Sequence, residues 1–227
     1  MAGYVGQLRS PFFMPMNKAA FDPDCRRCSR LALFLDAIKA DHPDYHCRPV
    51  PPFGDPRARL LLVGLAPGMH GANRTGRPFT GDYAGILLYE TLYKLGLSSA
   101  PTSVSVDDGL TLKGVRISNA VKCLPPDNKP LPLEIGTCNP YLQAELAGSP
   151  EVRVIVALGA IGHAAVLRAL GLKLAAHRFA HGAEHALPDG RRLVDSYHCS
   201  RYNTNTRRLT PVMFEAALGH AVQLLEG

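Results

Sequence analysis

The sequence predicts an α/β protein in which a three-layer α/β/α arrangement is built on a four-stranded parallel sheet. Two observations favour this class. Short apolar runs of strand length alternate along the chain with segments whose apolar residues recur at helical spacing. The first of these runs is followed by a long loop rich in glycine, and open α/β sheets bind their ligands in such loops, at the carboxyl ends of the strands.

Length and composition fit a single domain over residues 1–227, with an irregular N-terminal extension at 1–24. The formal net charge of +6 and the isoelectric point of about 9.1 fit a nucleic-acid or phosphate partner, and they fit an ordinary basic protein equally well. The chain has no apolar run of roughly eighteen residues and no recognisable secretory signal. We therefore expect no membrane partner and a cytoplasmic location.

The strands are expected at 59–65, 115–121, 152–158 and 193–197. The helices are expected at 31–38, 83–95, 132–147, 164–170 and 212–225. Thr210 and Pro211 suit the N-cap and the first position of the last helix. The Pro-rich segment 41–58 is expected to cross the molecule in an extended form, and a hairpin-like turn is expected at 188–190.

The loop at 64–82 is the most informative stretch of the chain. It has almost twenty residues, whereas a plain connection from strand to helix needs only a few. Among its glycines lie one histidine, one aromatic residue and one acid: His70, Phe79 and Asp82. The loops at 119–131, 159–163 and 198–209 are expected at the same edge of the sheet, so their side chains should lie near this loop.

Four of the six cysteines form a pattern. Cys25 and Cys28 make a C-x-x-C pair at the start of a helix, and Cys123 and Cys138 follow much later in the chain. Four thiolates from two distant segments can hold a tetrahedral zinc ion or an iron–sulfur cluster. A redox pair and a set of unrelated thiols are the alternatives. The remaining cysteines are expected to be free thiols: Cys47 and Cys199.

Several motifs occur in the order seen in uracil-DNA glycosylases. They are Gly-Leu-Ala-Pro-Gly at 64–68, Gly-Arg-Pro-Phe-Thr-Gly-Asp at 76–82, Asn-Ala-Val-Lys-Cys-Leu-Pro-Pro at 119–126, Cys138, and His-Cys-Ser-Arg-Tyr-Asn at 198–203. The run His-Gly-Ala-Asn-Arg-Thr-Gly at 70–76 resembles in particular the family-five (B-type) enzymes of bacteria and archaea. The resemblance covers roughly residues 25 to 225.

The resemblance implies an activity and a cofactor. It implies excision of uracil and of other deaminated bases from DNA, which leaves an abasic site. It also implies a structural [4Fe–4S] cluster on Cys25, Cys28, Cys123 and Cys138, which would tie the N-terminal segment to the segment after the second strand. Where several sister families carry a carboxylate or an asparagine in the first motif, this chain has Ala66, as expected of the B type.

A glycosylase flips the target base out of the duplex, so its pocket needs a stacking surface and a group that reads the base edge. Phe79 is the candidate for stacking, and its alternative role is to anchor the loop in the core. Asn119 offers a donor and an acceptor for uracil, and its alternative role is to cap the following turn. Glycines in the loop would let backbone amides approach the base or a phosphate closely. The loop residues assigned to substrate binding on this ground are Gly64, Leu65, Ala66, Pro67, Gly68 and Gly71.

Bond cleavage leaves positive charge on the sugar and negative charge on the departing base. Asp82 is the candidate that stabilises the sugar cation and orients water, and it can also cap the following helix. His198 is the candidate that donates a hydrogen bond to the leaving base. His70 is the other histidine near the site, where a phosphate or backbone contact suits it better. No lysine is among these candidates, so we expect no Schiff base and no strand nicking.

The last motif supplies the expected DNA contacts. Tyr202 is placed to wedge between base steps after flipping, with Arg201 and Asn203 beside it. We expect a monomer that acts on uracil-containing DNA and is associated with the nucleoid. Two rivals remain. One is a non-catalytic nucleic-acid-binding module with a cysteine-bound metal, and the other is a nucleotide phosphohydrolase, although the loop lacks the P-loop ending.

One further pattern is the four-residue spacing of His177, His181 and His185, which on a helix would place three imidazoles on one face. Gly182 and the turn that follows argue against a helix there. We therefore expect no metal site formed by these three residues.

Overall fold

The computed structural model describes residues 21–226, and most of the irregular extension expected at 1–24 lies outside this range. Within it, a six-stranded sheet forms the middle layer, with the strand order β1-β3-β2-β4-β6-β5. The strands are β1 (Phe53–Gly54), β2 (Leu60–Gly64), β3 (Val115–Asn119), β4 (Val154–Leu158), β5 (Glu184–Ala186) and β6 (Arg192–Ser196).

The four central strands confirm the predicted parallel sheet, because β3, β2, β4 and β6 are parallel to their neighbours. The predicted count of four was wrong for the whole sheet, since β1 and β5 add an antiparallel strand at each edge. The β1 strand has only two residues, and β5 has the exposure pattern of a polar edge strand. Neither carries the apolar run by which the central strands are recognised. The β5–β6 hairpin confirms the turn expected at 188–190.

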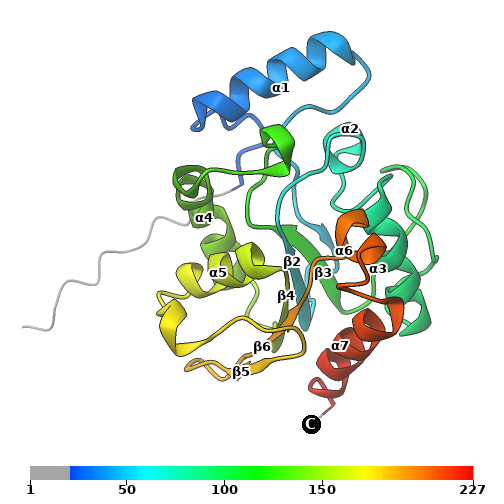
Figure 1. Cartoon of the computed structure of the whole chain (residues 1–227), viewed down its shortest axis with the longest axis vertical. Helices are drawn as coiled ribbons and strands as arrows, with labels where there is room; N and C mark the ends of the chain where they lie inside the picture. Colours follow the sequence, from blue (N-terminus) through cyan, green and yellow to red (C-terminus); the bar gives the residue numbers. More distant parts are fainter. Residues whose placement is uncertain (1–20, 227) are drawn as a thin grey trace, which may run out of the picture.

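Helices cover both faces of the sheet, as predicted. They are α1 (Ser29–Asp41), α2 (Ala72–Thr75), α3 (Tyr83–Lys94), α4 (Pro132–Ala147), α5 (Ala160–Ala169), α6 (Arg201–Asn205) and α7 (Pro211–Gln223), with short 3₁₀ turns at η1 (Pro126–Asn128) and η2 (Leu174–Ala176). In Figure 1, α4 and α5 lie on one side of the sheet, α3 and α7 lie on the other, and α1 crosses one end.

Alternation along β2 explains why the sheet is buried on both faces. Leu60 and Leu62 pack into the core beneath α3 and α7, while Leu61 and Val63 pack into the core beneath α4 and α5. All five residues of β2 are buried, as expected for a central parallel strand. The rigid layer that results places the strand ends, and the loops after them, at one edge.

Helix starts follow capping chemistry that can be recognised in the sequence. The Thr210 side chain accepts a hydrogen bond from the Met213 N–H at the start of α7, with Pro211 at the first position. Asp82 caps α3 in the same way. Two short helices, α2 and α6, lie inside stretches that we expected to be loops, and each is too short to show helical periodicity.

The N-terminal helix α1 is docked against the Gly-rich loop. Just after α1, the backbone N–H groups of His46 and Cys47 donate to the carbonyls of Arg74 and Asn73, and Met69 packs near Leu35. This segment therefore braces the loop at 64–82 from outside. Within the described residues, none of the helices has the length and apolar character needed to span a membrane.

Candidate active site

The candidate site lies where β2 and β3 end. Gly64 and Asn119 are the last residues of these strands and are direct partners in the parallel ladder. The loop that starts after Gly64 returns to the same place at Phe79 and Asp82. Strand order thus brings the first and second predicted motifs together, as expected from the parallel topology.

Gly64 makes room for two of the predicted pocket residues. A Cβ atom at Gly64 would lie 2.5 Å from Asn119 Oδ1 and 2.6 Å from Phe79 Cζ, so any side chain there would collide with both. Asn119 is 3% exposed, and its Oδ1 atom is buried without a hydrogen-bond partner. An unpaired buried amide oxygen lowers the stability of the folded protein by about 1–3 kcal/mol. A hydrogen bond from a bound ligand would remove this cost.

Phe79 and His198 form the aromatic wall of the site. Their rings are stacked with centroids 5.9 Å apart and planes inclined by 28°. Phe79 is also packed in the core and has a positive φ of 54°, a strained conformation for an aromatic residue. The core therefore anchors Phe79, and one ring face lies against His198; its stacking on a flipped base stays a prediction.

Asp82 has two functions in the structure. Its Oδ1 atom accepts a hydrogen bond of 3.0 Å from the Gly85 N–H and so caps α3. Its Oδ2 atom faces the first motif, where a Cβ atom at Gly71 would lie 2.2 Å away and one at Gly68 2.9 Å away. These two glycines make room for the carboxyl group, and the approach of their backbone amides to the substrate stays a prediction.

Burial sets the protonation of both candidate catalytic groups. It raises the pKa of Asp82 above its ordinary value, while the Gly85 and Ala84 N–H groups and the Arg74 guanidinium work in the opposite direction. Burial lowers the pKa of His198 to about 4, so its imidazole is neutral at pH 7. Within the described residues neither ring nitrogen of His198 is hydrogen-bonded, which leaves one N–H to donate.

The rest of the first motif surrounds this centre. Leu65 is half-buried, and its carbonyl accepts from the Val121 N–H at 3.0 Å. Ala66 packs beside the cysteine pocket, and Pro67 is buried. The side chain of His70 is exposed. Its Nδ1 atom lies 2.8 Å from the Tyr45 hydroxyl, a contact that no sequence pattern indicated.

The last motif forms α6, directly after His198. Tyr202 is 71% exposed, as a wedge residue must be. The Arg201 guanidinium lies over the Tyr83 ring, 5.1 Å from its centroid. The Asn203 side-chain amide donates to the His198 carbonyl at 2.8 Å, so in this structure Asn203 holds the histidine segment in place.

Lys122 lies inside the second motif but faces away from the site. Its side chain is 3% exposed, and Nζ is bonded to the Ser118 hydroxyl and lies 3.4 Å from Glu145 Oε2 on α4. A lysine that forms a Schiff base must reach the sugar as a neutral amine. Lys122 is held as a buried ion pair instead.

A buried ion pair fixes the far end of the Gly-rich loop, and sequence reasoning missed it. The Arg77 guanidinium donates to Asp108 Oδ1 at 2.7 Å, to the Ser103 hydroxyl at 2.9 Å and to the Val106 carbonyl at 2.6 Å. Burial would raise the pKa of Asp108, but the hydrogen bonds from Arg77 and from the backbone N–H groups of Leu110, Val104 and Ser105 hold it well below its ordinary value. In the sequence, the Gly-Arg-Pro motif draws attention to Arg77, but it does not indicate which acidic residue Arg77 pairs with.

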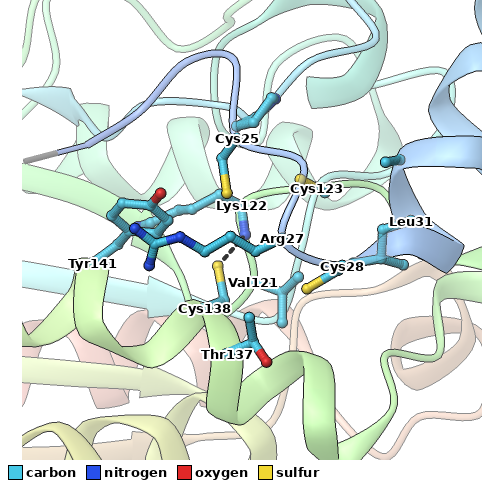
Figure 2. Close-up of a pocket in the computed structure, with 12 residues that line it drawn as sticks. Cys25, Arg27, Cys28, Leu31, Val121, Lys122, Cys123, Thr137, Cys138 and Tyr141 are labelled. Carbon is cyan, nitrogen blue, oxygen red and sulfur yellow. Dashed lines mark hydrogen bonds between the residues drawn. The ribbon is translucent and has the colours of Figure 1, made fainter. Parts of the chain in front are cut away.

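The four predicted cysteines line one pocket under α1 (Figure 2). Cys25 and Cys28 approach from the start of α1, and Cys123 and Cys138 approach from the loop after β3 and from α4. The Lys122 backbone N–H donates to Cys138 Sγ at 3.3 Å. Among the described residues, no three cysteine sulfurs lie within 4.8 Å of one another.

The two other cysteines are buried free thiols, as predicted. Cys47 lies 3.5 Å from the Asn73 side-chain nitrogen in the brace between α1 and α2. Cys199 is buried beside the catalytic candidates, where burial and the nearby Asp82 carboxylate raise the pKa of its thiol. Its position next to His198 gave no hint of this contact with Asp82.

Comparisons with known proteins identify the family to which this chain belongs. The family model of the uracil DNA glycosylase superfamily matches residues 51–221. A type-5 uracil-DNA glycosylase of Thermus thermophilus is 51% identical over 205 residues, which cover 88% of this chain and 93% of the relative. Type-5 enzymes of Pyrobaculum aerophilum and Mycobacterium bovis are 46% and 44% identical, over 82% and 88% of this chain and 83% and 78% of the relatives. The chain therefore belongs to the uracil-DNA glycosylase superfamily, among its type-5 members.

Proposed function

We propose that this protein hydrolyses the N-glycosidic bond of uracil, and of other deaminated bases, in DNA and leaves an abasic site. The observation that carries the proposal is the convergence of an unpaired amide at the end of β3, an aromatic wall and a half-buried carboxyl group at the start of α3. Type-5 uracil-DNA glycosylases are the relatives that share most of this chain.

Recognition is assigned to Phe79 and Asn119. The flipped base stacks on Phe79, whose ring is held in the core, and the Asn119 side chain pairs with the polar edge of the base. Pairing satisfies the Asn119 oxygen, which has no partner among the described residues. A base that offers no matching hydrogen-bond edge leaves that oxygen unpaired and binds less well.

Catalysis is assigned to Asp82 and His198. As the bond breaks, the ionised Asp82 carboxylate stabilises the positive charge on the sugar and orients the attacking water through Oδ2, because Oδ1 is used by the α3 cap. The neutral His198 ring donates its N–H to the anionic leaving base. Charge stabilisation in a dry site is worth more than in water, so the burial of both groups serves the reaction.

DNA binding is assigned to α6 and the site rim. Tyr202 wedges between base steps, and Arg201 contacts phosphate with His70 nearby. The net charge of +6 favours binding to DNA at low salt. We also propose that the protein acts as a monomer.

We assign a structural [4Fe–4S] cluster to Cys25, Cys28, Cys123 and Cys138. The four thiols line one pocket, so all of them can reach a single metal group there. The N–H bond to Cys138 is also typical of cluster ligands. The cluster would tie α1 to α4 and so support the brace behind the Gly-rich loop; iron and sulfide analysis with visible absorption spectra tests the assignment.

The test of function uses end-labelled oligonucleotides that carry uracil, hypoxanthine, xanthine or, as a control, an undamaged base at one position. We expect strand cleavage at uracil only after alkali, which reports an abasic site. Cleavage without alkali would contradict monofunctional hydrolysis. Tight binding of the uracil strand with no abasic product would favour the rival reading, a non-catalytic nucleic-acid-binding module.

A further inference from the structure

A second cluster of metal-binding side chains lies on the α5 side of the sheet, and neither the cysteine pocket nor the active site uses it. His163 comes from α5, His185 from the edge strand β5, and Asp195 from β6. Their ligand atoms all lie within 4.8 Å of one another. His163 Nδ1 is 2.7 Å from Asp195 Oδ1, and His185 Nε2 is 3.0 Å from Asp195 Oδ2.

The hydrogen bonds around His163 require a positive charge at this place. Its Nε2 atom faces the His177 carbonyl at 2.8 Å, and a carbonyl only accepts, so Nε2 carries a proton. In a neutral ring Nδ1 then has a lone pair, which would face a carboxylate oxygen at 2.7 Å. A cation must lie between the two atoms, and it is either a proton or a metal ion.

Among the described residues, only two histidines are placed to compensate the negative charge of Asp195. Asp195 is fully buried, and within the described residues its only ionic partners are the two histidines, with no lysine or arginine. A buried carboxylate without compensation is strongly unfavourable. The two side chains that face it are imidazoles, the ligands that zinc and similar transition ions prefer.

We propose that His163, His185 and Asp195 form a binding site for one Zn²⁺ ion. The hydrogen bond from His163 to a backbone carbonyl is the contact that orients most metal-binding histidines. Zinc binds through His163 Nδ1, His185 Nε2 and an Asp195 oxygen, with water in the fourth position. The His177 ring lies next to His185, with the two ring centroids 5.6 Å apart.

Zinc replaces a proton at this site. In the metal-free protein, one proton lies between His163 and Asp195, and a second lies on His185 Nε2. When the Zn–N and Zn–O bonds form, the first proton leaves to the buffer, and the ring proton of His185 moves to Nδ1. Two ligand atoms around tetrahedral zinc are about 3.3 Å apart, so the side chains separate by several tenths of an ångström. His185 can move because it lies on an edge strand with its side chain 12% exposed.

The position of the site indicates a structural role. Asp195 lies three residues before His198 on the same chain segment, and His163 lies just after the Gly159 turn, where a Cβ atom would come within 3.4 Å of His198 Cβ. A zinc ion here would link α5, β5 and β6 behind the segment that carries His198. The inference does not depend on the proposed activity.

The test measures zinc binding to the full-length protein as isolated, after a chelator wash that leaves its cysteine-bound metal in place. We expect calorimetry to give one Zn²⁺ per chain, with about one proton released when buffers of different ionisation enthalpy are compared. X-ray absorption should show nitrogen and oxygen ligands at about 2.0–2.1 Å and no sulfur. Zinc should also raise the thermal midpoint.

Variants separate this site from surface binding. His185→Gln should weaken zinc binding by at least about tenfold. His220→Gln, which removes an exposed histidine paired with Glu184, should leave zinc binding unchanged. His163→Gln is the second variant if His185→Gln does not fold. Failure of the wild type to bind zinc, sulfur ligands around the bound ion, or undiminished binding in the folded variant would each overturn the proposal and leave a proton-bridged network.

Discussion

The carboxyl group of Asp82 occupies the space that a side chain at Gly71 would fill. Its Oδ2 atom lies 2.2 Å from the position of a Cβ atom on that glycine, and its Cγ and Cβ atoms lie 2.5 and 2.7 Å from the same position. Gly71 is therefore required, because any side chain at that position would collide with Asp82. Asp82 stands at the start of α3, and the loop folds back onto it.

Gly71→Ala should displace the Asp82 carboxyl group. Because misplacement of a catalytic group by about 1 Å can cost a hundredfold in rate, we expect single-turnover excision of uracil to fall by about that factor. Gly219→Ala is the matched control, since nothing lies within 4 Å of a Cβ atom there, and it should keep the wild-type rate. A Gly71→Ala protein with the wild-type rate would show that the position of Asp82 is not critical.

Asn119→Ala should lower activity without lowering stability. The variant removes an amide whose oxygen is unpaired, so the free energy of unfolding should stay the same or rise, while excision of uracil falls by about a hundredfold. Asn139→Ala provides the contrast, because its amide donates to the Ala165 carbonyl at 2.9 Å away from the site. That variant should lose about 1–3 kcal/mol of stability and keep its catalytic rate constant. The reverse pattern in urea unfolding and single-turnover assays would refute the assignment.

The pH dependence should follow Asp82 and not His198. Asp82 acts when ionised, and burial raises its pKa, so the excision rate should increase with pH through a value above the ordinary range for aspartate. His198 acts as a neutral donor with a pKa of about 4, so the rate should not fall as pH rises through about 6.5. Single-turnover rates between about pH 4.5 and 8.5 test this. A decline centred near pH 6.5 would mean that a protonated histidine is the required acid.

Tyr202→Ala should slow excision from duplex DNA more than excision from single strands. A wedge stabilises the gap left in a duplex, and a single strand has no such gap. The side chain is 71% exposed, so its removal should leave the thermal midpoint unchanged. Tyr93→Ala, at a tyrosine that is 50% exposed on α3, serves as the control. Equal losses on the two substrates would exclude a wedge role.

Much of this architecture could be predicted from patterns along the chain. The four parallel strands are apolar runs, and the caps at Asp82 and Thr210 have the expected residue types. The edge strands were missed because two or three residues cannot show a period. The motif order also predicted that Asn119, Phe79 and His198 lie together.

Contacts between distant segments could not be predicted. The Arg77–Asp108 ion pair, the Tyr45–His70 hydrogen bond and the approach of Cys199 to Asp82 join residues without any shared spacing. Such contacts depend on how loops pack after the sheet forms, and local sequence does not encode that. The two glycines beside Asp82 were recognised as motif residues, but the sequence did not indicate that they make room for its carboxyl group.

The most direct test of the proposed mechanism compares wild type with Asp82→Asn in single-turnover excision of uracil and in DNA binding. Asparagine keeps the shape of the side chain and is a good N-cap, so α3 and the fold should persist. With the negative charge lost, we predict a rate lower by about a hundredfold or more, with unchanged affinity for uracil-containing DNA. A folded Asp82→Asn protein that excises uracil at the wild-type rate would contradict the central role given to this carboxylate.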